Sequence, residues 1–377
     1  MKYSTVENEY LIELLNAAVK NTAVKAPPKN INWKAFVDLA KRQQVYSIIA
    51  PVLSSISMPE EQSKELVLYN QNELLRLIAM KNEQEQLESE LEKAGIKFML
   101  LKGSLLRNYY PQLKMRQMSD VDILYDYSKR DKLFEIMKGR GYTLISDGGN
   151  SDDFTKKPFY TFEFHHRLFK DAYGFCPDFD FVWDNAVQAS DNSCKYNMSV
   201  EDLYLHSAAH MYKHYIFGGF GIRFFIDTYL LVMAEEKSWN QEYIDKKLRE
   251  MKIFDFERLV KKISFNLMND EELDTEQTEF FNKVTGSGIY GSHQYDVSEV
   301  YENIKRSTGK SSVLSYIFIR LFPSKKQMKS IYPQLESKPF LMPFYYVKRI
   351  IVKAFGNFGK IINEIKSLMN IKKNNGG

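Results

Sequence analysis

Apolar residues recur at helical spacing through the first ninety residues of the chain. Residues 11–19 and residues 36–49 each carry this period, which predicts amphipathic helices, and Pro27-Pro28 separates them. A longer helix is predicted over residues 60–93, with Gly95 well placed to end it. The N-terminal part of the chain is therefore expected to be helical.

After residue 95, the spacing of apolar residues changes to the pattern expected of β-strands. A hydrophobic run at residues 98–101 stops before Gly103-Ser104, after which residues 105–110 can start a helix. At residues 120–124, Asp120 and Asp122 alternate with apolar residues. Successive side chains of a strand point to opposite faces, so the two carboxylates should share one face.

Further along, helical and strand patterns alternate. We expect a helix at residues 129–139, a short strand at 141–145, and a polar loop at 146–157 that could cover a cleft. Residues 160–165 alternate and predict a strand, with Thr161, Glu163 and His165 on one face. Residues 198–267 are predicted to be helical again.

The Asp pair and the Gly-Ser turn suggest a common chemistry. Two neighbouring carboxylates repel each other unless a cation lies between them, and Mg²⁺ prefers carboxylate and phosphate oxygens. Glycine allows close approach of the backbone, Ser104 offers a hydroxyl, and a helix start presents free N–H groups to a phosphate.

This order of elements resembles a known family. A strand, Gly-Ser, a helix and an Asp-hydrophobic-Asp-hydrophobic strand are similar to the polymerase-β-type nucleotidyltransferase core. More narrowly, Leu101-Lys102-Gly103, Tyr109-Tyr110-Pro111 and Arg116 ahead of residues 120–124 resemble an uncharacterised bacterial group of nucleotidyltransferase family proteins. The gap between Ser104 and Asp120 is long for the superfamily, whereas the Lys-Gly and Arg flanks match the narrower group.

The resemblance implies an α+β fold, in which a small mixed β-sheet core is flanked by N-terminal and C-terminal helical domains. The expected segments are an N-terminal helical region (1–94), a nucleotidyltransferase core (95–197), a helical domain closing the cleft (198–270), and a C-terminal helical extension with a basic aromatic tail (271–377).

The resemblance also implies a reaction: Mg²⁺-dependent transfer of a nucleoside monophosphate from an NTP to an acceptor hydroxyl, with two metal ions. The implied catalytic and metal-binding residues are Asp120, Asp122 and Glu163, and the implied NTP-binding residues are Lys102, Gly103, Ser104 and Arg116. Glu163 is the first choice for the third carboxylate because Glu-Phe-His resembles the acidic-hydrophobic-His strand of the family. Asp178 and Asp180 alternate similarly and remain alternatives.

A second hypothesis is a catalytically inactive nucleotide-binding or interaction protein on the same fold. It would keep the Gly-Ser turn with a misplaced third carboxylate.

Three histidines form one stripe of a predicted helix. His206, His210 and His214 are spaced four residues apart, without a His-Glu-x-x-His pattern. We expect them to face the cleft or to pack as polar core residues rather than to bind zinc.

The amino-acid composition limits the class of protein and the kinds of partner that we expect. With 44% apolar and 27% charged residues in a chain of 377, the protein matches ordinary soluble globular proteins. A net charge of +4 is too small for this length to argue for nucleic acid. The absence of a strongly basic groove argues mildly against long nucleic acid, which makes a small-molecule or protein acceptor the expected partner. Two cysteines form no disulfide framework, and the first residues lack a signal-peptide pattern, so we expect a cytoplasmic protein. Residues 340–373 mix aromatics with lysines and could lie on a membrane surface or pack against the helices.

Overall fold

The computed structural model describes residues 5–147, 149–169, 175, 177–216, 219–286, 325, 328, 332, 335 and 338–348. The helices are α1 (Val6–Lys20), α2 (Trp33–Arg42), α3 (Tyr46–Ile49), α4 (Glu60–Lys93), α5 (Gly103–Leu106), α6 (Arg130–Gly139), α7 (Val200–Ile216), α8 (Arg223–Glu235), α9 (Gln241–Glu250), α10 (Phe254–Met268) and α11 (Thr275–Thr285). The strands are β1 (Phe98–Leu100), β2 (Val121–Tyr125), β3 (Thr143–Ser146), β4 (Ser151–Lys156), β5 (Tyr160–His165), β6 (Val187–Gln188) and β7 (Lys195–Asn197).

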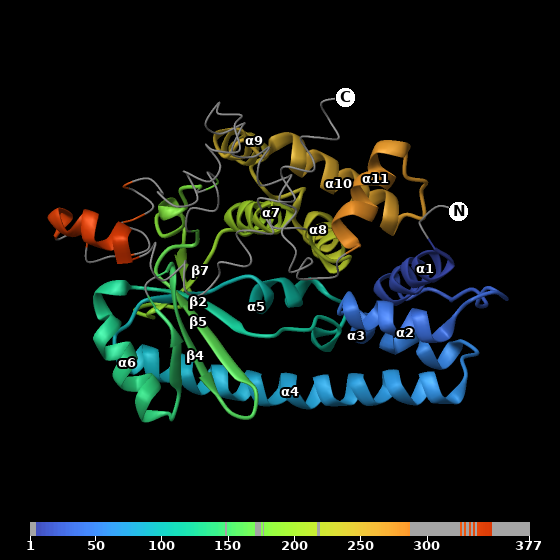
Figure 1. Cartoon of the computed structure of the whole chain (residues 1–377), viewed down its shortest axis with the longest axis horizontal. Helices are drawn as coiled ribbons and strands as arrows, with labels where there is room; N and C mark the ends of the chain where they lie inside the picture. Colours follow the sequence, from blue (N-terminus) through green and yellow to red (C-terminus); the bar gives the residue numbers. More distant parts are fainter. Residues whose placement is uncertain are drawn as a thin grey trace.

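The strands form one mixed sheet in the order β3-β4-β5-β2-β1-β7-β6. At its centre, β2 pairs with β1 antiparallel and with β5 parallel. The parallel register places Asp122 directly opposite Glu163. Helices before and after the sheet in sequence flank it, which confirms the α+β class (Figure 1).

The two faces of the sheet pack against different helices. Val121 and Ile123 lie in one hydrophobic cluster with residues of α4 and α6, including Leu87 and Leu133. Leu124, from the opposite face of β2, belongs to a second cluster that contains much of α7 and parts of α8 and α9. Asp122 shares the face of Leu124 because side chains alternate along a strand. The carboxylate is therefore on the side of the sheet that α7 covers (Figure 1).

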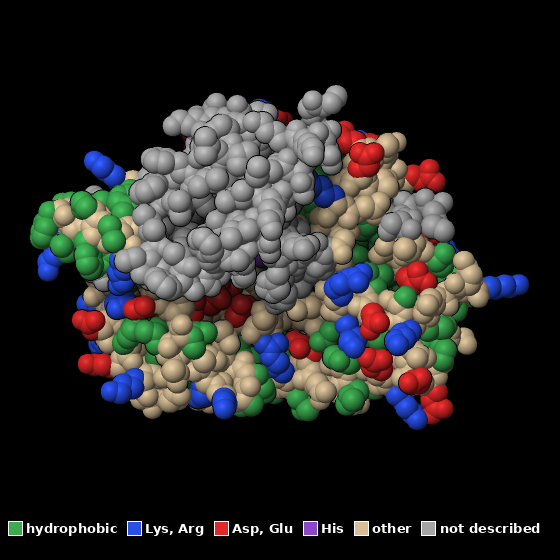
Figure 2. Space-filling model, viewed as in Figure 1, with side chains coloured by type: hydrophobic (Ala, Val, Ile, Leu, Met, Phe, Trp, Pro, Cys, Tyr) green, Lys and Arg blue, Asp and Glu red, His purple; other side chains and the backbone are tan. Residues whose placement is uncertain are grey.

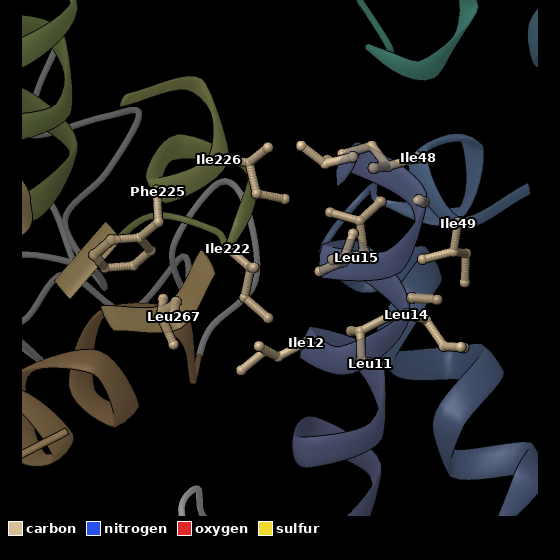
Figure 3. Packing of buried hydrophobic residues seen from close by; sticks show 14 of the residues in the cluster. Leu11, Ile12, Leu14, Leu15, Ile48, Ile49, Ile222, Phe225, Ile226 and Leu267 are labelled. Atoms are coloured by element: carbon tan, nitrogen blue, oxygen red, sulfur yellow. The ribbon is translucent and has the colours of Figure 1, made fainter. Parts of the chain in front are cut away.

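A third cluster joins the N-terminal helices to α8, α10 and α11. Apolar residues of α1 and α3, such as Leu15 and Ile48, pack with Ile222, Phe225 and Leu267 from the region of α8 and α10 (Figure 3). Among the described residues, this cluster contains none from the strands. Residues 33–49 form α2 and α3, which contribute to this cluster and not to the cluster beneath the sheet. They pack against the later helices, while α4 runs beneath the sheet (Figure 1).

The helix expected at residues 60–93 is confirmed as α4, and Gly95 follows its end at φ +63°, a conformation that glycine adopts without strain. The polar loop expected at 146–157 is wrong in part, since residues 151–156 form β4 between β3 and β5. Asp152 within β4 is buried and accepts hydrogen bonds from Tyr125 and Arg130. These partners stabilise a strand that carries few apolar residues.

The expected division into four segments stays a prediction. Most of the tail at residues 340–373, with its expected contact to a membrane surface, lies outside the described residues. Within the part that the structure describes, no helix combines the length and apolar character needed to cross a bilayer.

Candidate active site

Asp122 is a buried carboxylate in the middle of the sheet, with an exposed fraction of 5%. Its Oδ1 accepts hydrogen bonds from the ammonium of Lys102 and from His165 Nε2, the latter at 2.7 Å. Burial alone would raise the pKa of Asp122, but Lys102 and His165 together hold it well below its usual range. Asp122 is therefore ionised at neutral pH.

Lys102 lies between β1 and α5, at the turn that the sequence singled out. Its backbone has φ +45°, a left-handed conformation that residues with a Cβ seldom adopt and that is common at functional sites. Burial would lower the pKa of its ammonium, but the charges of Asp122, Glu163 and Asp120 raise it. Lys102 thus carries a positive charge among the three carboxylates.

Glu163 and His165 reach the same position from β5. His165 Nε2 lies 3.5 Å from Glu163 Oε2. Asn150 Nδ2 donates to His165 Nδ1 at 3.1 Å, which assigns the ring proton to Nε2 and directs it at Asp122. One ligand atom from each of Asp122, Glu163 and His165 lies within 4.8 Å of the others, a group that could hold a metal ion.

Asp120 precedes β2 by one residue and lines the same cavity as Asp122 and Glu163. Burial raises the pKa of Asp120 to about 6, and the neighbouring charges of Asp122 and Glu163 add to the effect. Three acidic groups around one buried cation leave net negative charge, which a bound cation would neutralise. The carboxylate oxygens suit Mg²⁺, while the imidazole nitrogen suits softer metals.

These groups open into a cavity of about 250 Å³ between the sheet and the helices α7 and α8. The sheet side contributes Lys102, Gly103, Asp120, Asp122 and Glu163, and α7 and α8 contribute Ser207, His210, Lys213, His214, Arg223, Phe224, Asp227 and Thr228. Figure 2 shows acidic side chains in a hollow of the visible face, where Figure 1 draws β2 and β5.

Of the four residues predicted to bind NTP, Lys102 contacts Asp122, and the other three differ in their placement. Gly103 lines the cavity, where a Cβ would lie 2.7 Å from Arg116 Nη1. Ser104 follows it, but its buried hydroxyl has no hydrogen-bond partner among the described residues and does not line the cavity. Arg116 lines the cavity while its Nε and Nη2 bind Asp227, each at 2.8 Å. Their role in substrate binding stays a prediction.

The alternatives for the third carboxylate are placed elsewhere. Asp178 and Asp180 are both exposed, and neither lines the cavity. Residues 180–182 form a 3-10 turn rather than the continuation of a strand, and Asp178 accepts a hydrogen bond from the amide of Asp180. Of the candidates from the sequence, the structure brings Glu163 to the Asp pair.

The histidine stripe of α7 divides between cavity and core. His210 and His214 line the cavity, with their Nε2 atoms 3.0 Å apart. Burial and nearby cations lower the pKa of His214 to about 3 and that of His210 well below its usual value. His206 is buried against the rings of Phe169 and Phe179. Both expectations for this stripe are therefore met, each by different members.

Sequence reasoning missed two features of the site. Asn150 lies in a polar stretch where nothing marks one amide as special, so no signal could have found it. The ion pair of Asp227 with Arg116 joins residues 111 positions apart, and no local pattern connects the two. His165 was seen on the face of Glu163, and the metal-type grouping could have been inferred from that face.

The comparisons with known proteins agree with this geometry. No curated protein and no solved structure matches the chain. The family described as uncharacterised nucleotidyltransferase matches residues 29–269, more than half of the sequence and all the residues around the cavity. The chain therefore belongs to this family of nucleotidyltransferases.

Proposed function

We propose that the protein is a Mg²⁺-dependent nucleotidyltransferase, which transfers a nucleoside monophosphate from an NTP to the hydroxyl of an acceptor. The observation that supports it most is the register of β2 and β5, which puts Asp122 opposite Glu163. Asp120 lines the same cavity as these two carboxylates. Together with the family membership, three acidic groups that line one cavity favour nucleotidyl transfer over simple binding.

Asp120, Asp122 and Glu163 would hold the metal. Bound there, Mg²⁺ would act as a Lewis acid on the phosphate oxygens of the substrate. His165 fixes the orientation of Asp122 through the hydrogen bond from its Nε2, and Asn150 fixes His165 in turn. Such supporting hydrogen bonds keep metal-binding carboxylates in place.

Glu163 is the best placed of the three to accept the proton of the acceptor hydroxyl. Its side chain is 30% exposed, whereas that of Asp122 is 6% exposed and already accepts two hydrogen bonds on Oδ1. Lys102 would keep a positive charge beside the carboxylates when phosphate enters, and Gly103 leaves open the space that a Cβ would fill. The acceptor would be a small molecule or a protein, in keeping with the small net charge.

One observation favours a second candidate function, a catalytically inactive nucleotide-binding protein. The ammonium of Lys102 contacts Asp122 Oδ1, an atom that a metal ion would use. A lysine in this place can replace the cation and leave the site without metal chemistry. The two functions differ in whether nucleotide binding requires Mg²⁺.

Calorimetric titration of NTPs, with and without Mg²⁺, tests the proposal on wild type and on Asp120→Asn and Asp122→Asn. Asp178→Asn is the matched control, because it removes an exposed carboxylate outside the cavity. We expect binding that requires Mg²⁺ and is lost in both cavity variants but kept in the control. Binding that is indifferent to Mg²⁺ and to the variants would establish the inactive candidate instead.

A further inference from the structure

The segment just before β2 carries Asp120 but is not part of the sheet. Residues 116–120 belong to no helix or strand, and each of them lines the cavity. The parallel register that sets Asp122 opposite Glu163 begins at Val121 and does not include Asp120. Contacts from outside the sheet must therefore help to fix the Asp120 carboxylate.

Arg76, on α4, binds the main chain at the end of this segment. Its Nη1 donates to the carbonyl oxygen of Met118 and its Nη2 to that of Ser119, each at 2.5 Å. A guanidinium is planar and presents its N–H donors as a rigid fork, so bonds to two successive carbonyls fix both the position and the direction of the chain. The residue that follows these two is Asp120.

Glu73 holds the guanidinium of Arg76 from three residues earlier on α4. Its Oε1 lies 3.3 Å from Arg76 Nη1, and its side chain is 11% exposed. Burial raises the pKa of Glu73, and the charge of Arg76 and a hydrogen bond from the amide of Met118 oppose that rise. Helix α4 thus binds Met118 through both its amide and its carbonyl oxygen.

Helix α4 gives Arg76 a fixed base. Met80, one turn later, is buried in the cluster that contains Val121 and Ile123 of β2. The same helix therefore packs beneath β2 and binds the segment that precedes it (Figure 1).

The Asp120 carboxylate is linked to the residues that Arg76 binds. Burial raises the pKa of Asp120, and a hydrogen bond from the Ser119 side chain opposes that rise. Ser119 therefore contacts Asp120 through its side chain and Arg76 through its main chain. A movement of the Ser119 peptide would shift the carboxylate as well.

We propose that Arg76 is a positioning residue of the metal site, which fixes the Asp120 carboxylate through the carbonyl oxygens of Met118 and Ser119. This inference rests on the proposed function, in which Asp120 is a metal ligand. Arg76 does not line the cavity, so it acts through the main chain and touches neither metal nor substrate. Without it, the carboxylate would sample more positions, and the affinity of the site for a divalent cation would fall.

The test is titration of the full chain with Mn²⁺, which suits carboxylate ligands as Mg²⁺ does and whose free ion is measured by electron paramagnetic resonance. Arg76→Met removes both donors and keeps an apolar stem. Arg76→Lys keeps the charge but not the fork. We expect Arg76→Met to bind Mn²⁺ roughly 10-fold more weakly than wild type, the lower end of the range for losing a hydrogen-bond partner of a metal ligand, and Arg76→Lys to be intermediate.

Arg140→Met is the matched control. Arg140 follows α6 and joins it to α4 through largely buried ion pairs with Glu83 and Glu90, and none of these three residues lines the cavity. This variant should lose stability in urea, as Arg76→Met does, but keep wild-type affinity for Mn²⁺. Hydrogen exchange of residues 116–122 in the metal-free protein, measured by mass spectrometry, should be faster in Arg76→Met than in Arg140→Met.

Wild-type affinity for Mn²⁺ in Arg76→Met would overturn the inference and leave the proposed function standing. An equal loss in Arg140→Met would also overturn it, because the effect would then come from general destabilisation. If Arg76→Met does not fold, Arg76→Lys decides alone: weaker binding supports the inference, and wild-type affinity overturns it. If wild type binds no Mn²⁺, the inference fails, and the NTP titration of the aspartate variants shows whether the proposed function fails with it.

Discussion

Replacing Asp227 with asparagine removes a buried charge that joins the segment before β2 to helix α8. Asp227 accepts three hydrogen bonds of 2.8 Å, from Tyr110 OH and from Nε and Nη2 of Arg116. The side chains of Arg116 and Asp227 are 7% and 5% exposed. The guanidinium of Arg116 would therefore lose its ion-pair partner while it remains largely buried.

The expected loss follows from this geometry. Breaking a buried ion pair by removing one partner costs about 3–5 kcal/mol, because the other charge keeps its desolvation penalty without its partner. Asp227→Asn should therefore lower the free energy of unfolding by about 3 kcal/mol or more, since the amide can keep only part of the three hydrogen bonds. The second variant, Arg116→Met with Asp227→Asn, should recover part of this loss, since both charges are then absent.

Urea denaturation followed by far-ultraviolet circular dichroism gives the free energies. Glu236→Gln is the control, because Glu236 follows the same helix but pairs with Lys261 while its side chain is 46% exposed. Its effect should stay below about 1 kcal/mol, as for other exposed ion pairs. An Asp227→Asn protein as stable as the Glu236→Gln protein would refute the reasoning, since a buried charge cannot be left uncompensated at no cost.

Three further predictions concern the site. Gly103→Ala places a Cβ 2.7 Å from Arg116 Nη1, which its neighbours hold in place, so thermal denaturation should show a loss of about 1–3 kcal/mol and an unchanged midpoint would contradict this. Asn150→Ala removes the donor to His165 Nδ1 but leaves Asp122 to accept from Nε2, so ¹⁵N NMR should show a shifted Nδ1 resonance with the proton still on Nε2, and an unchanged Nδ1 resonance would contradict this. Burial lowers the pKa of His206 in the folded protein to about 3. Between pH 6.5 and pH 3 the unfolded chain therefore binds this proton and the folded protein does not, so the free energy of unfolding decreases as the pH is lowered. His206→Leu should reduce the slope of the free energy of unfolding against pH by about 1.4 kcal/mol per pH unit, as measured from denaturation curves. An unchanged slope would exclude His206 as its source.

Local patterns predicted those elements that local physics determines. Helix α4 follows from the spacing of its apolar residues and from the glycine after it, and β5 follows from its alternation. Strand β4 was missed because its sequence, Ser-Asp-Asp-Phe-Thr-Lys, has one apolar side chain. It becomes a strand through its two neighbours in the sheet and through the partners of Asp152.

The candidate site was predictable in its residues more than in its contacts. The Asp pair and Glu163 could be named because strand alternation puts acidic groups on one face. The register that sets Asp122 opposite Glu163 depends on pairing between strands about forty residues apart, which a single sequence does not state. The helical wall of the cavity depends on tertiary packing of α7 and α8 over the sheet, so Lys213 had no local signal.

The cluster that α1 to α3 share with α8, α10 and α11 limits when its parts can pack during synthesis. Asn16 Nδ2 donates to Leu267 O across 251 residues, and Gln43 Nε2 donates to Thr285 O across 242 residues. At about 5–20 residues per second, a ribosome needs roughly 10–50 s to make the residues between such partners. The apolar faces of α1 to α3 leave the ribosome long before α8, α10 and α11 exist to cover them. The emerging chain consequently exposes those faces to chaperones and to other nascent chains, although the N-terminal helices form from local contacts within microseconds.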